Sequence, residues 1–278
     1  MLRVVITSSR RSQSEQVPAG TLTGEVTVRS PDNATTSGCK VDLIGGFRLR
    51  LHDRVVELPL GAQRLISYLA LEGSWVTRTY AAEMLWPDSR RRQAAANLRT
   101  ALWRVRGQAC NDVVWTAPGR LALADTVAVD MQEAAKQARA LIEAPVGQGA
   151  ELPGVNAETV SRLSIRLLPG WYDDWVVSEQ ERWDQLRLHA LEAAAEVLLC
   201  RGQHMLALEA GLVAARSELF RESAHRVIIR VYLAEGNWGA AMQHYQDYRR
   251  MLRRELNLAP TTAMDELMHP LITSHTSQ

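Results

Sequence analysis

The sequence has few cysteines and no long apolar run. Its three cysteines, Cys39, Cys110 and Cys200, lie too far apart for a Cys-x-x-Cys pair. This spacing argues against a disulfide framework and a zinc site, and it favours a reducing compartment. No apolar run approaches the ~18 residues of a membrane helix, and the run at residues 4–6 is too short for a secretory signal. We therefore expect a cytoplasmic protein with no membrane partner and no metal.

The motifs of common catalytic sites are also missing. The seven histidines show no His-Glu-x-x-His spacing, and there is no Walker loop, Gly-x-Gly-x-x-Gly or Gly-x-Ser-x-Gly. Asp173 and Asp174 form an acidic pair, but adjacent side chains do not normally point at one reacting atom. We interpret the pair as the polar start of a helix. We expect neither an enzyme nor a bound cofactor, and a hydrolase that uses this pair is the weakest alternative.

Charge is unevenly distributed along the chain, although the net charge is only +1. Residues 41–127 contain twelve arginines and eight acidic residues, a net charge of +4. Residues 128–278 contain 15 basic and 20 acidic residues, a net charge of −5. A basic front half and an acidic rear half indicate that only the front half meets a polyanion.

Composition and periodicity divide the chain into three parts and predict a mainly α protein. Residues 1–39 are rich in Ser, Thr and Gly without periodicity, which predicts a disordered tail. Residues 40–126 combine small antiparallel sheets with helices. Residues 127–278 predict an all-α, tetratricopeptide-like domain.

Strands, three helices and a hairpin follow one another in the second part. Strands are predicted at 41–44, 47–51, 55–58, 113–117 and 120–124, and helices at about 62–73, 77–86 and 93–106. Pro118 and Gly119 suit the turn of the last hairpin. This order is that of a winged helix, in which the third helix enters the major groove of DNA.

The third predicted helix is amphipathic. Its apolar face consists of Ala94, Leu98, Ala101, Leu102 and Val105. The opposite face carries amide, hydroxyl and guanidinium groups, which can distinguish base pairs. The predicted DNA-binding residues are Arg92, Gln93, Asn97, Arg99, Thr100, Arg104 and, after the hairpin turn, Arg120. Trp103 lies on the same polar face, and it either covers a domain interface, the preferred interpretation, or lies beside a phosphate contact.

The rear half contains an internal repeat. Gly202 and Gly236 are 34 residues apart, and Ala207 and Ala241 follow them in the same register. A period of 34 residues, with Gly in the turn and a small residue in the following helix, is the tetratricopeptide pattern. It predicts stacked helix pairs. The main alternative function is therefore a tetratricopeptide adaptor that binds protein and does not read DNA.

Several runs of residues in both halves match one known protein family. The runs are Leu85-Trp86, Asn97-Leu98-Arg99 and Leu102 to Arg106 in the front half, and 218–226 and 255–260 in the rear half. Together they resemble the Streptomyces antibiotic regulatory protein (SARP) family. The resemblance implies a winged helix that reads direct repeats in promoter DNA, followed by a bacterial transcriptional activation domain. It implies activation by recruitment of RNA polymerase holoenzyme, often at secondary-metabolite genes such as those of antibiotic biosynthesis.

The resemblance also suggests where the polymerase would bind. In the family the loop between the second and third helices is the expected polymerase contact, which corresponds here to 87–92. Arg92 directly precedes the third helix and is best placed for DNA, so Arg90 and Arg91 are the expected polymerase contacts. The expectation is a nucleoid-associated activator with promoter DNA and polymerase as partners, and a homodimer on DNA is left open.

Overall fold

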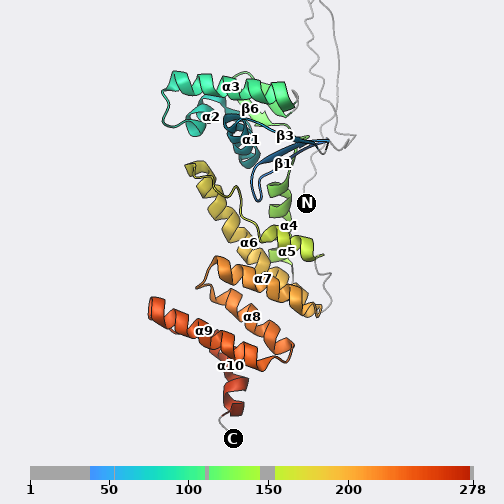
Figure 1. The fold of residues 1–278 in the computed structure, drawn as a ribbon, viewed down its shortest axis with the longest axis vertical. Coiled ribbons are helices and arrows are strands. Elements are labelled where there is room, and N and C mark those ends of the chain that lie inside the picture. The colour runs from blue at the N-terminus through green and yellow to red at the C-terminus, as the bar shows by residue number, and fades with distance from the viewer. Residues whose placement is uncertain (1–37, 53, 110–112, 145–153, 276–278) are drawn as a thin grey trace, which may run out of the picture. The chain divides into compact units, whose positions relative to one another are not determined.

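The computed structural model describes residues 38–52, 54–109, 113–144 and 154–275 (Figure 1). Most of the predicted tail, Cys110 and most of the loop 144–156 lie outside these residues. The first strand begins at Cys39, which is buried. The folded part of the chain therefore starts inside the range predicted as tail.

Short strands precede a long series of helices in the described residues. The strands are β1 (Cys39–Asp42), β2 (Arg48–Leu51), β3 (Arg54–Val56), β4 (Val76–Thr77), β5 (Val114–Ala117), β6 (Arg120–Leu123) and β7 (Ala128–Val129). The helices are α1 (Leu60–Glu72), α2 (Arg78–Leu85), α3 (Arg91–Ala109), α4 (Asp130–Glu143), α5 (Ala157–Leu163), α6 (Asp174–Cys200), α7 (His204–Ser217), α8 (Glu222–Ala234), α9 (Trp238–Leu256) and α10 (Thr262–His275). The predicted mainly α fold, with small sheets near the N-terminus, is confirmed.

The front part contains two small sheets. One has the strand order β3-β2-β1-β7 and the other β4-β6-β5. The hairpins β1–β2, β2–β3 and β5–β6 are antiparallel, as predicted, whereas β7 pairs with β1 in parallel. Strands β4 and β7 were not predicted, because a strand of two residues has no periodicity to detect.

Local capping residues set the ends of the first two helices. Gly73 ends α1 with a φ of 60°, a left-handed conformation that suits glycine. The Thr77 hydroxyl accepts a hydrogen bond from the Tyr80 amide at 3.3 Å and so caps α2. Gly119 turns the β5–β6 hairpin with a φ of 71°. These three positions set where α1 ends, where α2 begins and where the β5–β6 hairpin, the wing, turns.

The third helix starts earlier than predicted. The Ala94 amide donates to the Arg90 carbonyl at 2.9 Å, so α3 begins at Arg91 and not at Gln93. Arg91 and Arg92 therefore belong to the first turn of α3. The predicted charged loop 87–92 is correspondingly shorter.

The rear helices stack as pairs joined by tight turns. Gly202 joins α6 to α7 and Gly236 joins α8 to α9, each with a φ of 70°. Ala207 and Ala241 are fully buried where the second helix of each pair packs against its neighbour. Figure 1 shows α7, α8 and α9 side by side, in agreement with their contacts. The predicted tetratricopeptide-like arrangement is confirmed for these helices.

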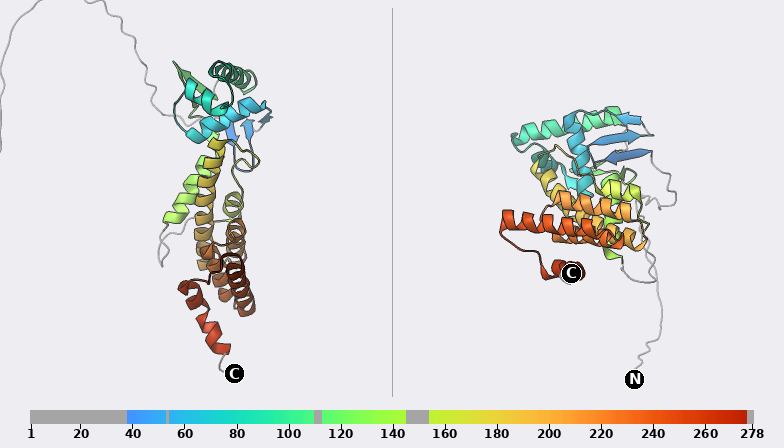
Figure 2. Two further views of the ribbon diagram at one scale, coloured as in Figure 1. Left: turned by 90° about the vertical axis from the view of Figure 1, so that its left-hand side faces the viewer. Right: turned by 60° about the horizontal axis from the view of Figure 1, so that its bottom comes forward.

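The winged helix and the rear helices share a continuous core. One cluster of buried side chains runs from β1 to α8, across the predicted domain boundary at 126–127. Helix α6 contacts α1 at its start, and it contacts α7 and α8 further along (Figure 2). There Arg64 of α1 forms an ion pair with Asp173, the residue that precedes α6, and Tyr68 packs edge-on against Trp175 with ring centroids 5.4 Å apart. Asp173 and Asp174 thus form the start of a helix, as interpreted from the sequence.

A single carboxylate joins β1 to α4. Asp130, the first residue of α4, accepts hydrogen bonds from the amides of Leu43, at 2.8 Å, and Ile44, at 3.0 Å. Burial raises the pKa of the Asp130 carboxyl, although both amide bonds act in the opposite direction. The contact spans 87 residues of sequence and ties the loop after β1 to the first rear helix.

Replacement of Asp130 by alanine should destabilise the fold. The amides of Leu43 and Ile44 would lose their acceptor in a partly buried position, which costs about 1–3 kcal/mol of unfolding free energy. Urea denaturation of Asp130→Ala and of the control Asp125→Ala, an exposed carboxylate five residues away, measures the effect. Equal stability of the two variants would contradict this role of Asp130.

Candidate nucleic-acid interface

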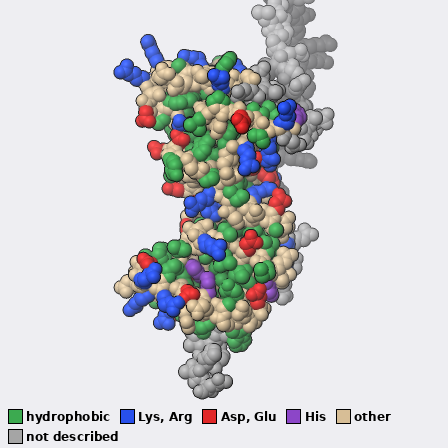
Figure 3. Space-filling model, in the orientation of Figure 1, with side chains coloured by type: hydrophobic (Ala, Val, Ile, Leu, Met, Phe, Trp, Pro, Cys, Tyr) green, Lys and Arg blue, Asp and Glu red, His purple; other side chains and the backbone are tan. Residues whose placement is uncertain are grey.

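Helix α3 has one buried face and one open face. Its buried residues, between 1% and 5% exposed, are Ala94, Leu98, Ala101, Leu102 and Val105. These residues recur at the spacing of one helical face, and they pack in the core beside α1 and α2, which both contact α3. Burial of this row determines which side chains of α3 face outward. Figure 3 shows Lys and Arg side chains (blue) at the top of the molecule, where Figure 1 places α3.

The outward residues fall into three rows. With 3.6 residues per turn, positions three, four and seven apart share a row. The first row is Gln93, Asn97 and Arg104; the central row is Ala96, Thr100 and Trp103; the third row is Arg92, Arg99 and Arg106. The central row lies opposite the buried row. All six predicted DNA-binding residues of α3 are therefore on its open side. The first row, called the amide row, contains two amides and one arginine, and the third row contains only arginines.

The polar side chains of the first two rows are partly ordered by bonds within the helix. Gln93 Nε2 donates to Asn97 Oδ1 at 2.9 Å, and the Thr100 hydroxyl donates to the Ala96 carbonyl at 3.1 Å. The remaining amide donors and acceptors of Gln93 and Asn97 can still pair with an external group. Such bonds hold the amide row in one geometry before any partner arrives.

The wing is attached to the start of α2 and to the C-terminal part of α3. Arg120, the predicted wing residue, begins β6 directly after Gly119 and is exposed. The Gly119 carbonyl accepts from the Arg78 amide at 2.9 Å, which ties the wing turn to the start of α2. Near the end of α3, Arg106 Nη2 donates to the Thr116 hydroxyl of β5 at 3.2 Å. The wing and α3 are therefore held to the same body.

Trp103 does not cover a domain interface, and the interpretation preferred from the sequence is wrong. Its side chain is 64% exposed, because it lies on the row opposite the buried face. The Arg104 guanidinium carbon lies 4.9 Å from the centroid of its ring. Sequence reasoning also missed two further exposed tryptophans, Trp75 and Trp115 of β5, which stack on each other with centroids 6.5 Å apart. Neither belongs to a periodic pattern that could have indicated the stack.

The two arginines predicted to contact polymerase are both exposed, but they differ in their surroundings. Arg91 Nε donates to Glu83 Oε1 of α2 at 2.8 Å, in an ion pair open to solvent. In the described part of the chain the Arg90 side chain forms no hydrogen bond or ion pair, and its carbonyl accepts the hydrogen bond with which α3 begins. Arg90, at the turn between α2 and α3, therefore has an unpaired charge, whereas the charge of Arg91 is paired with Glu83.

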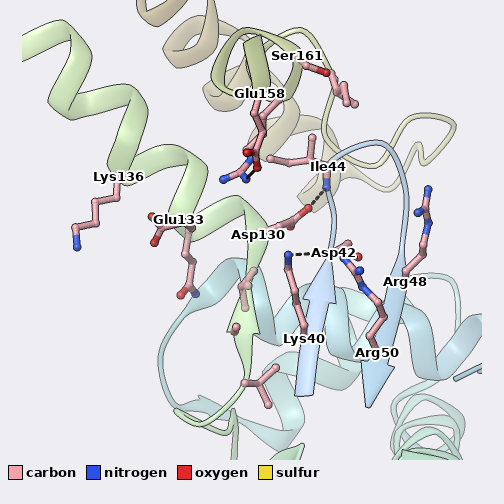
Figure 4. Close-up of a pocket in the computed structure, with 16 residues that line it drawn as sticks. Lys40, Asp42, Ile44, Arg48, Arg50, Asp130, Glu133, Lys136, Glu158 and Ser161 are labelled. Atoms are coloured by element: carbon pink, nitrogen blue, oxygen red, sulfur yellow. Dashed lines mark hydrogen bonds and ion pairs between the residues drawn. The ribbon is translucent and has the colours of Figure 1, made fainter. Parts of the chain in front are cut away.

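A concave region of about 850 Å³, separate from the open face of α3, lies between β1, β2, α4 and α5 (Figure 4). Charges of both signs line it, and several already form pairs: Lys40 with Asp42, at 3.5 Å, and Arg162 with Glu158, at 2.9 Å. We therefore assign no ligand to this region. Within the described residues no group of His, Cys, Asp and Glu side chains could hold a metal ion. No helix among them is both long and apolar enough to cross a membrane.

The two faces of α3 should respond differently to substitution. Leu98→Ala removes a side chain that is 3% exposed and should lower the unfolding free energy by about 2–5 kcal/mol. Trp103→Ala removes an exposed ring and should change stability by less than about 0.5 kcal/mol. Thermal and urea unfolding of both variants measure the contrast. A large loss of stability in Trp103→Ala would mean that the ring packs against the body.

Comparisons with known proteins agree with this architecture. The family model of the bacterial transcriptional activator domain matches residues 117–271. The regulatory protein AfsR of Streptomyces griseus is 24% identical over 248 residues, which cover 86% of this chain but 25% of AfsR. A solved structure of Mycobacterium tuberculosis EmbR, in complex with a low affinity phosphopeptide, has the same fold, with a TM-score of 0.64 at 16% identity.

The EmbR alignment covers 85% of this chain and 65% of the EmbR chain. The chain thus spans a quarter of AfsR and less than two thirds of EmbR. AfsR is named as a regulatory protein. These findings confirm the SARP resemblance, and the chain belongs to the family of the bacterial transcriptional activator domain.

Proposed function

We propose that this protein activates transcription by binding specific promoter sequences through α3 and the wing. The observation that carries the proposal is the open face of α3, where a row of amides and a row of arginines flank the central row. The buried face holds the helix firmly against the body. A helix presented in this way fits the width of the major groove.

Each outer row has a matching feature of duplex DNA. Asn and Gln amides pair with adenine, and an Arg guanidinium pairs with guanine, so Gln93, Asn97 and Arg104 suit base edges. The arginines of the third row suit phosphates, which contribute affinity but no sequence information. Arg120 on the wing would add a further backbone contact. The backbone contacts would attract DNA of any sequence, and the contacts to base edges would add a sequence preference.

The regulators that the sequence resembles suggest a finer version of the proposal. We infer that the target is a pair of direct repeats in a promoter, with one copy of the chain on each repeat, and that bound copies recruit RNA polymerase holoenzyme. The controlled genes would belong to secondary metabolism. Such a protein would work in the bacterial nucleoid.

Salt titration of DNA binding tests the proposal. The logarithm of the association constant should fall linearly with the logarithm of salt concentration, by about 0.9 for each neutralised phosphate. Arg120→Ala should reduce this slope by roughly one unit and weaken binding about equally on all sequences. Arg139→Ala, an exposed arginine of α4, is the control and should leave the slope unchanged.

Duplexes selected from a random library by the wild-type chain serve as the ligand in this titration. A chain that binds no duplex would contradict the proposed function and favour an adaptor that contacts only protein. Binding that Arg120→Ala leaves unchanged would remove the wing from the interface but not α3.

We further propose that Arg90 and Arg91 contact the polymerase. Both lie at the turn into α3, and because successive side chains diverge, they cannot all face the DNA beside Arg92. The Arg91–Glu83 pair is exposed and therefore weak, so a stronger acidic partner could replace Glu83. Surface charges of this kind steer and orient a protein partner.

Arg90→Ala combined with Arg91→Ala should reduce transcription far more than promoter binding. We expect a loss of about tenfold in transcription, equivalent to about 1.4 kcal/mol at a protein contact, with little change in the dissociation constant for DNA. In vitro transcription beside a binding titration measures both quantities, with Arg139→Ala again as control. Parallel losses in the two assays would instead place both arginines on DNA.

A further inference from the structure

Trp103 exposes a large apolar surface at an unusual place. Single exposed apolar side chains are common and need no explanation by themselves. This one lies at 64% exposure on the central row of α3, opposite the buried face and between two polar rows. If α3 enters the major groove, the central row is the one that points most directly at the floor of the groove.

The rest of the central row is also apolar on its outer side. Ala96 offers only a methyl group. The Thr100 hydroxyl is directed along the helix to the Ala96 carbonyl, at 3.1 Å, which leaves the threonine methyl group for an outward contact. Ala96, Thr100 and Trp103 therefore form a short apolar row, flanked by Gln93, Asn97 and Arg104 on one side and by arginines on the other.

The floor of the major groove offers one apolar group to such a row. Guanine, cytosine and adenine present hydrogen-bond donors and acceptors there, whereas thymine also presents its 5-methyl group. An indole ring placed against this methyl group excludes water from both apolar surfaces. A polar side chain at position 103 would gain nothing from the same group.

Arg104 makes the site more specific. Its guanidinium lies against the indole ring, 4.9 Å from the centroid, a cation–π distance. The contact restricts the rotation of the guanidinium, whose planar fork suits the O6 and N7 acceptors of guanine. Adjacent residues on one helix then face neighbouring base pairs.

We propose that Trp103, supported by the methyl group of Thr100, recognises the 5-methyl group of a thymine next to the base pair that Arg104 contacts. This inference rests on the proposed function, since it requires α3 in the major groove. It assigns base recognition to a side chain that is not among the polar residues predicted to bind DNA.

Removal of single methyl groups from DNA tests the inference. A duplex selected by the wild-type chain is synthesised again with each thymidine replaced in turn by deoxyuridine, which removes the methyl group and keeps the base pairing. At one or two positions the wild-type dissociation constant should rise about fourfold, the effect of one buried methyl group. Trp103→Ala should bind the normal duplex more weakly and show no further loss at those positions.

Trp75→Ala is the matched control, because it removes another exposed tryptophan, 45% exposed, outside α3. It should retain the full methyl effect, and Trp103→Phe should retain part of it. A methyl effect that persists in Trp103→Ala would overturn the inference, as would a wild-type chain that binds DNA without any methyl effect. Both results would leave the proposed function intact, whereas a chain that selects no duplex would contradict both.

Discussion

Burial of the apolar row of α3 is the constraint on which the interface depends. Complete burial of one Leu or Val side chain contributes about 1.5–3 kcal/mol, so the row as a whole fixes the rotation of the helix about its axis. A rotation that brought Trp103 inward would expose Leu98 and Val105 to water. The open face is therefore set before any ligand binds, and little conformational entropy remains to be lost on binding.

Partly buried polar contacts join the winged helix to the rear helices. The ion pair between Arg64 and Asp173 is partly buried, with side chains 19% and 27% exposed, so loss of either partner would leave an uncompensated charge. Asp130 adds two amide bonds at a second point of contact. Because these contacts continue into one core, the described residues of the front part and of the rear part form one folded unit.

Periodicity predicted most of the helices, because each buries one face: the apolar rows of α1 and α3 and the glycines of the 34-residue repeat are local signals. Contacts between distant residues have no such signal. Arg64 and Asp173 are 109 residues apart, and the parallel pairing of β7 with β1 depends on the finished fold. For the interface, the pattern predicted which residues of α3 lie off the apolar face. It could not show whether another element covers Trp103, and for that reason the interpretation of Trp103 failed.

The central claim is that the open face of α3 binds in the major groove. Interference by dimethyl sulfate tests it most directly, because the reagent methylates N7 of guanine in the major groove and N3 of adenine in the minor groove. Duplexes methylated sparsely before binding are separated into bound and unbound fractions and sequenced. The account predicts that guanine methylation at a few adjacent positions blocks binding. Interference confined to adenines, or absent at every guanine, would contradict it.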